Sequence, residues 1–271
     1  MKITLITCTY NAAGVLQRTL DSVLSQTYPD IEHLIIDGKS KDATVSMAND
    51  YKAASDSKGN GHTVVIQSEP DKGLYDAMNK GIQKATGDYL CFLNAGDKLA
   101  DELTIADIVS CIRQNGKPAD NAPRTSNLVP RTYSVIYGET NIVDDNGTFL
   151  RHRRLQAPEH LTWRSFRMGM LVCHQSFYAN TKIAKQTPYN LKYRISADVD
   201  WCIRIMKTGA EQGLDTLNTH RVLCHYLDGG MSIKNHRASL VERLKTMANH
   251  YGIIDTIMLH LWFAVRAVLK K

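Results

Sequence analysis

Short apolar runs alternate with amphipathic stretches along the first 114 residues of the chain. Apolar runs rich in β-formers predict buried strands, and the stretches between them carry apolar side chains at helical spacing. The predicted strands cover residues 3–8, 31–36, 63–67 and 88–93, and the predicted helices cover 12–26, 42–54, 74–85 and 101–114. A strand followed by a helix, four times over, predicts a doubly wound α/β fold built on a parallel sheet.

The pattern changes after residue 114. Residues 115–130 contain three prolines among polar side chains and predict a surface loop. Apolar runs at 133–137 and 148–153 then flank the turn signal Asp145-Asn146-Gly147, which predicts a β-hairpin. Later helices are predicted over 198–207 and 236–250. The chain is therefore divided into residues 1–114, the loop 115–130, a second half at 131–235 and C-terminal helices at 236–271.

Residues 253–269 are apolar at helical spacing, but Asp255, His260 and Arg266 interrupt them. Each charge at the middle of a bilayer would cost about 2.5–3.5 kcal/mol, so no membrane span is expected. Trp262 and the lysines that follow the helix add interfacial character. Two interpretations stay open: a helix that lies on a membrane surface, and a helix that packs on its own domain.

Composition places the chain among ordinary globular proteins, with 43% hydrophobic and 22% charged residues in a chain of 271. The net charge of +6 is uneven: residues 151–194 hold nine Lys and Arg against one acid, Glu159. Such a surface suits phosphorylated substrates, anionic lipid or nucleic acid, or is simply solvated. The six cysteines lack metal-knuckle spacing and predict small buried side chains in a reducing compartment. No signal peptide is expected before the first strand.

An acidic residue follows each of three successive predicted strands: Asp37, Asp71 and Asp97. Each alone is explained by a turn or a helix cap. The carboxyl ends of parallel strands share one edge, however, so three acids there indicate a ligand site. The first turn, residues 9–14, has one glycine and lacks the glycine patterns of dinucleotide and P-loop sites. A divalent metal, Mg²⁺ or Mn²⁺, is therefore expected to neutralise the phosphates of a nucleotide.

Five segments together resemble inverting glycosyltransferases of family 2, which have the GT-A fold. They are Thr7-Cys8-Thr9-Tyr10-Asn11, residues 37–44, 69–73 and 85–89, and Phe92-Leu93-Asn94-Ala95-Gly96-Asp97. The resemblance is close over about residues 1–110 and looser to about residue 232. The stretch 71–81 is similar to bacterial enzymes that build capsular polysaccharide or exopolysaccharide. The family implies a mostly parallel sheet with a Rossmann-like nucleotide-binding half, a mixed acceptor-side half and C-terminal helices.

The resemblance also implies roles for residues of the first half. Those expected to bind the nucleotide are Thr7, Thr9, Asn11, Asp37, Ser40, Asp71 and Gly73. Asp97 would be the metal carboxylate of the D-x-D element, with His225 as a further ligand. The chain departs from the family here, because Asn94 and Gly96 stand where the family often has Asp. Asn94 is expected to bind the donor or the metal through a neutral oxygen.

Sugar transfer also needs a base that takes the proton of the acceptor hydroxyl. By motif position the base is Asp198, although Ala197 replaces the Glu that precedes it in the family. Asp200 is the reserve, and either acid could instead stabilise the start of a helix. The residues expected to contact donor or acceptor are Asn94, His174, Gln175, Asp200 and Trp201. Residues 225–232 are predicted as a loop that Gly229-Gly230 allows to close on the donor.

The sequence thus predicts an enzyme that moves a sugar, with inversion, from a UDP- or GDP-type sugar to a hydroxyl of a glycan or lipid-linked acceptor. It is expected in the cytoplasm, at the inner face of the membrane, in cell-surface polysaccharide synthesis, with no nucleic-acid partner. A sugar nucleotidyltransferase is the first alternative, but it needs a Gly-rich loop bearing Arg or Lys after the first strand. A non-catalytic nucleotide-sugar-binding protein is the second, because the acids near Asp97 are depleted.

Overall fold

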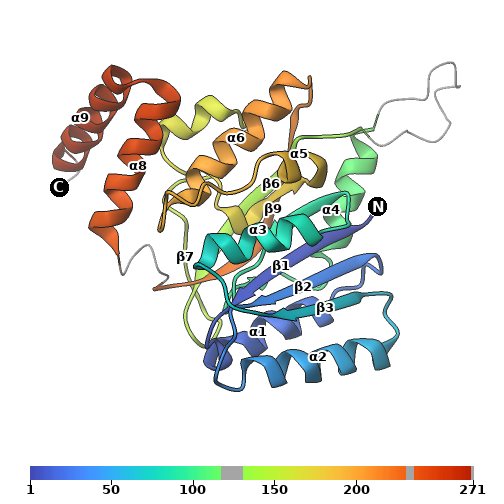
Figure 1. Ribbon diagram of the computed structural model, residues 1–271. Helices are drawn as coiled ribbons and strands as arrows, with labels where there is room; N and C mark the ends of the chain where they lie inside the picture. The colour runs from blue at the N-terminus through green and yellow to red at the C-terminus, as the bar shows by residue number, and fades with distance from the viewer. Residues whose placement is uncertain (117–130, 230–234, 270–271) are drawn as a thin grey trace, which may run out of the picture.

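A computed structural model describes residues 1–116, 131–229 and 235–269. The four predicted strand–helix units are present, and the helices of the first two lie at the bottom of Figure 1. Their elements are β1 (Ile3–Thr9), α1 (Ala13–Leu24), β2 (Ile31–Asp37), α2 (Thr44–Lys58), β3 (Thr63–Ser68), α3 (Leu74–Lys84), β4 (Tyr89–Phe92), β5 (Lys98–Leu99) and α4 (Thr104–Gln114). Strands β3, β2, β1 and β4 lie side by side in that order and are all parallel. The doubly wound prediction is confirmed.

The second half extends the same sheet. It adds β6 (Val135–Val143), β7 (Phe149–His152), β8 (Phe177–Asn180) and β9 (Thr216–Leu227), with 3₁₀ helices η1 (Trp163–Met168) and η2 (His174–Ser176) and helices α5 (Thr181–Gln186) and α6 (Ala197–Glu211). The sheet continues β4-β8-β6-β9-β5, with β8 antiparallel to both β4 and β6. The predicted hairpin is confirmed as the antiparallel pair β6–β7. The long strand β9, parallel to β6, was not predicted.

Helices cover both faces of the sheet because successive strand residues point to opposite sides. In β1, Ile3 and Leu5 join the core under α1, α2 and α4, whereas Ile6 and Cys8 join the core under α3, α5 and α6. Because both faces are covered, β1 and β2 are buried along their whole length, polar residues included, and the accessible edge lies at the strand ends.

Two C-terminal helices, α8 (His236–Tyr251) and α9 (Ile253–Leu269), form a pair set off from the sheet (Figure 1). Helix α8 packs against α6, and α9 packs against α8 and η1. Helix α9 nevertheless exposes large apolar side chains at helical spacing: Ile253, Ile254, Ile257, Met258, Leu261, Trp262 and Val265. Across the described ranges, no helix is long and apolar enough to cross a bilayer. Most of the predicted loop 115–130, and the segment from Gly230 to residue 234, lie outside the described residues.

Candidate active site

The ends of β1 and β2 meet at one edge of the sheet, where Asp37 organises the loop that follows β2. Its carboxylate accepts hydrogen bonds from the Thr9 hydroxyl (2.9 Å), the Ser40 N–H (2.9 Å), the Ser68 hydroxyl (2.6 Å) and the Ser40 hydroxyl. Burial raises the pKa of Asp37, but the donors of Ser40 and Ser68 outweigh it and hold the pKa below its usual range. A carboxylate with these four partners fixes residues 38–40 rather than offering a free oxygen.

The turn after β1 is tied to the same loop. Asn11 has a left-handed backbone, with φ of 49°, and is exposed. Its side-chain oxygen accepts the Lys41 N–H at 2.9 Å, and its own N–H donates to the Ser40 hydroxyl at 2.8 Å. The two turns therefore form one rigid rim.

Thr7 lies inside the sheet. Its hydroxyl donates to the backbone oxygen of Leu93 at 2.8 Å and lies 2.9 Å from Nε2 of His33, and the residue is fully buried. Thr7 shares the face of β1 on which Ile3 and Leu5 join the core, so its hydroxyl is engaged inside the sheet. Its expected contact with the nucleotide stays a prediction.

Asp71 closes the rim from the end of β3. Its Oδ1 accepts the N–H of Gly73 at 2.8 Å, and its Oδ2 faces Gly38 so closely that a Cβ there would lie 2.5 Å away. Gly38 is therefore required for this approach. Beside it stands Tyr10, which is 65% exposed. Sequence reasoning did not single out Tyr10 as a candidate, although an aromatic ring in a polar turn at a strand end is an available signal.

Asp97, after β4, is a buried anchor that joins three distant segments. Its Oδ2 accepts a hydrogen bond from Nε2 of Gln175 at 3.0 Å, and its Oδ1 accepts the backbone N–H of Leu227 at 2.9 Å. The residue is 3% exposed. Burial raises the pKa of Asp97 to about 6, although both N–H donors act to lower it. Asp97 thereby fastens η2 and the end of β9 to the loop after β4.

His174 bridges the two halves of the site. Its Nε2 lies 3.1 Å from Nδ2 of Asn94, and its Nδ1 lies 3.4 Å from Oδ2 of Asp198. If the Asn94 amide donates a hydrogen bond to Nε2, the ring proton of His174 is on Nδ1 and points at Asp198. Burial raises the pKa of Asp198, but the contact with His174 outweighs it and holds the pKa below its usual range. The Asp198 side chain keeps 17% exposure, so its carboxylate reaches the edge.

Gly96 explains the missing acid of the D-x-D element. Its φ of +98° is left-handed, and a Cβ there would lie 2.8 Å from the Leu227 side chain. An aspartate at this position would be strained and would collide with the end of β9. The departure from the family pattern therefore follows from the backbone.

The residues predicted to hold a metal do not fit a directly bound cation. Both oxygens of Asp97 already accept protein N–H groups. His225 lies in β9, not in the predicted loop, and its Nδ1 is buried without a hydrogen-bond partner among the described residues. Burial lowers the pKa of His225 and favours its neutral ring, the form that can ligate a metal, so the poor fit rests on Asp97 and not on His225. The part of the chain that the structure describes contains no group of three or more His, Cys, Asp or Glu arranged for a metal.

Asp200 and Trp201 pack inside the protein, and their expected contacts with donor or acceptor stay predictions. Asp200 is 4% exposed; its Oδ2 accepts Nε of Arg204 at 2.7 Å, and its Oδ1 lies 2.8 Å from Nε2 of His250. Trp201 is fully buried and stacks on Tyr189 with ring centroids 4.8 Å apart. Residues two and three positions after Asp198 point to other sides of α6, so only Asp198 faces the edge.

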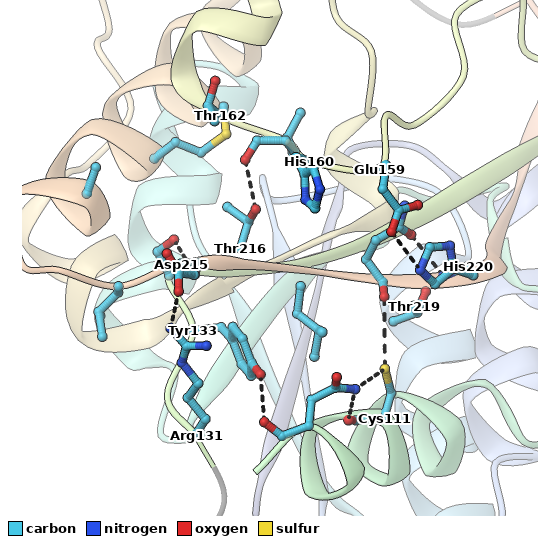
Figure 2. Close-up of a pocket in the computed structure, with 18 of the residues that line it drawn as sticks. Cys111, Arg131, Tyr133, Glu159, His160, Thr162, Asp215, Thr216, Thr219 and His220 are labelled. Carbon is cyan, nitrogen blue, oxygen red and sulfur yellow. Dashed lines mark hydrogen bonds and ion pairs between the residues drawn. The ribbon is translucent and has the colours of Figure 1, made fainter. Parts of the chain in front are cut away.

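A separate cavity of about 710 Å³ lies at the amino ends of β6 and β9, the opposite edge of the sheet. Figure 2 shows Arg131 paired with Asp215 on one side of it and His220 paired with Glu159 on the other. The predicted site residues do not line this cavity.

Solved structures with the same arrangement define the fold. The S. aureus protein TarS, residues 1–349, superposes with a TM-score of 0.64 at 14% identity, over 97% of this chain and 72% of that one. The mannosyltransferase PcManGT from Pyrobaculum calidifontis, solved in complex with GDP-Man and Mn²⁺, gives 0.62 at 16% identity, over 96% and 70%. The fold is thus the GT-A fold of nucleotide-sugar transferases, as predicted.

The sequence relatives define the family. The model of Glycosyl transferase family 2 matches residues 4–171. The PGL/p-HBAD biosynthesis glycosyltransferase of Mycobacterium bovis (strain BCG / Pasteur 1173P2) is 32% identical over 257 residues, 93% of this chain and 86% of that protein. The amylovoran biosynthesis glycosyltransferase AmsB of Erwinia amylovora is 28% identical over 207 residues, 74% and 62%. The chain belongs to glycosyl transferase family 2 and is a nucleotide-sugar glycosyltransferase. The predicted glycosyltransferase class is therefore confirmed, and the nucleotidyltransferase and non-catalytic alternatives are set aside.

Proposed function

We propose that Asp198 is the general base of an inverting sugar transfer. Its carboxylate takes the proton of the acceptor hydroxyl while that oxygen attacks the anomeric carbon of the donor sugar. The bond from this carbon to the nucleoside diphosphate breaks, and the diphosphate leaves from the opposite face. The observation that carries the proposal is the contact with His174, which holds Asp198 charged and oriented at the edge.

The donor would bind along the rim formed by the first three strand ends. We propose that the nucleoside base stacks on the exposed ring of Tyr10 and that the free side of Asp71 accepts its hydrogen bonds. Thr9, Asn11, Asp37, Ser40 and Gly73 would shape this rim rather than all touch the ligand. Residues 1–114 would then bind the donor, and residues 131–235 would form the acceptor side.

A divalent cation is retained as the proposed cofactor, with the donor rather than the protein as its main ligand. Mg²⁺ or Mn²⁺ would be held mainly by the donor diphosphate, because the oxygens of Asp97 are engaged by Gln175 and Leu227. The mannosyltransferase PcManGT was solved with Mn²⁺, which supports a cation in a protein of this fold. Bound there, it would neutralise charge on the leaving phosphates.

The acceptor is proposed to be a glycan or a lipid-linked glycan. The relatives are described as glycosyltransferases of PGL/p-HBAD and of amylovoran biosynthesis, which supports a cell-surface glycolipid or polysaccharide product. The exposed apolar stripe of α9 would lie on the inner face of the membrane and bring the enzyme to such an acceptor. Asp255 on α9 is paired with Arg167, so this acid need not oppose anionic headgroups.

Donor turnover tests the proposal, with water as a substitute acceptor. The protein is incubated with UDP- and GDP-sugars and Mn²⁺ or Mg²⁺, and release of nucleoside diphosphate is measured. Asp198→Asn should lower kcat by about 10²- to 10⁴-fold while the affinity for the nucleoside diphosphate stays unchanged. Asp21→Asn, on the exposed face of α1, is the matched control. Wild-type turnover that survives in Asp198→Asn would refute Asp198 as the base.

A further inference from the structure

Glu242 of helix α8 holds the segment that leads into Asp198. Its Oε1 accepts the backbone N–H of Arg194, and its Oε2 accepts those of Ile195 and Ser196, each at 2.9 Å. The first N–H groups of a helix have no partner within that helix. The Glu242 carboxylate, which comes 46 to 48 residues later in the chain, therefore holds the three residues before α6.

Residues 194–196 also form hydrogen bonds with Tyr75 and Ser239. The hydroxyl of Tyr75 on α3 donates to the backbone oxygen of Ile195 at 2.8 Å. The side-chain oxygens of Ser196 and Ser239 lie 2.8 Å apart. Tyr75 follows the loop that carries Asp71, so its hydrogen bond to Ile195 links the donor rim to the acceptor side. Asp198 comes two residues after Ser196, so the placement of residues 194–196 determines where Asp198 lies.

The charge of Glu242 suits this role. Burial raises the pKa of Glu242, but the three backbone N–H donors outweigh it and hold the pKa below its usual range. A carboxylate offers acceptor oxygens on both branches, whereas a glutamine offers one oxygen and one amide group. Glutamine can therefore keep the bonds to Ile195 and Ser196 but must place its amide against the N–H of Arg194. Alanine keeps none of the three.

We propose that Glu242 is a positioning residue for Asp198, so that the pair α8–α9 is part of the catalytic machinery and not only an attachment surface. The proposal rests on the proposed role of Asp198 as the base. A segment released by loss of Glu242 would let Asp198 move away from His174, which lies 3.4 Å from it. Misplacement of a reacting group by about 1 Å costs roughly 100-fold in rate. Among the described residues, Glu242 accepts hydrogen bonds from the backbone of Arg194, Ile195 and Ser196 and none from the donor rim.

The test compares full-length Glu242→Ala and Glu242→Gln with wild type in the donor turnover assay. We expect kcat to fall by about 10- to 100-fold in Glu242→Ala and by less in Glu242→Gln, with the donor KM unchanged. The acid limb of the pH profile of kcat should move to higher pH in Glu242→Ala, because Asp198 loses the contact that lowers its pKa. Glu211→Ala, an exposed acid at the far end of α6, is the control and should match wild type.

The outcomes separate the two proposals. A folded Glu242→Ala with wild-type kcat, or one that loses only donor affinity, overturns the positioning role. A Glu242→Ala that does not fold leaves the decision to Glu242→Gln, which must show a lower kcat at an unchanged KM and otherwise refutes the role. Asp198→Asn that remains as active as wild type removes the base itself and the proposal with it. Wild type that binds nucleoside diphosphate but turns over no donor overturns the proposed function, and the positioning role falls with it. Failure of the positioning role alone shows as an inactive Asp198→Asn beside a fully active Glu242→Ala.

Discussion

The charge of Asp97 should cost the protein stability at neutral pH, and Asp97→Asn should remove that cost. The carboxylate is 3% exposed and burial raises its pKa to about 6, from an ordinary value of 3.8. Between these values the unfolded chain gives up the proton while the folded protein keeps it, so stability falls as the pH rises and levels off above about pH 6. Each unit is worth about 1.4 kcal/mol, so about 2 kcal/mol is lost between pH 4.5 and about 7, where the loss has levelled off.

Asparagine is a suitable replacement because it preserves the contacts. Its oxygen can accept the N–H of Leu227, and its amide can donate to Gln175 once that side-chain amide turns over. Urea unfolding of wild type and Asp97→Asn at pH 4.5 to 7.5 gives the difference in unfolding free energy, in which other titrating groups cancel. We expect this difference to shift by about 2 kcal/mol in favour of the asparagine variant as the pH rises. A difference that is flat with pH, or that shifts in the opposite direction, would refute a buried carboxylate with a raised pKa.

Three further changes test other parts of the structure. Gly96→Asp restores the family's acid but should destabilise the protein by about 1–3 kcal/mol without strengthening Mn²⁺ binding, as measured by thermal unfolding and titration; a stable variant that binds Mn²⁺ more tightly would contradict the backbone explanation. Tyr10→Ala should weaken binding of nucleoside diphosphate by about tenfold in calorimetry, with Phe149→Ala as the exposed aromatic control; equal affinities would exclude stacking on Tyr10. Ile254→Glu combined with Leu261→Glu should reduce co-sedimentation with phosphatidylglycerol vesicles by at least about tenfold, whereas Leu103→Glu should not; unchanged sedimentation would argue against the α9 stripe as the membrane surface.

The parallel half of the fold was predictable because its information is local. Each apolar run between 3 and 93 is long enough for one buried strand, and each is followed by a helical pattern. The edge at which Asp37, Asp71 and Asp97 gather follows from parallel strands alone. Helix ends differed by a few residues, as α2 shows by starting at Thr44 and ending at Lys58.

The second half was less predictable because its elements depend on distant partners. Strand β9 contains polar residues throughout, and its pairing with β6 across about 80 residues of sequence stabilises it. The same limit applies to side chains. Nothing local distinguishes Asp198, which faces the edge, from Asp200, which binds Arg204 and His250. The partners of Asp97 were equally hidden, since Gln175 and Leu227 come from other parts of the chain.

The hydrogen bonds of Asp97 also bear on the order in which the chain folds during its synthesis. These hydrogen bonds close intervals of 78 and 130 residues, so neither can form on a chain that has not yet been synthesised through η2 and β9. The parallel half, complete by β4, can gather its strands on the ribosome by short-range crossovers while its central carboxylate is still in water. The hydrogen bonds from Gln175 and Leu227 to Asp97 then form late and together, because each closes a long loop. If Asp198 is the base, as proposed above, a chain synthesised only through β4 carries the rim but not yet the group that takes the proton.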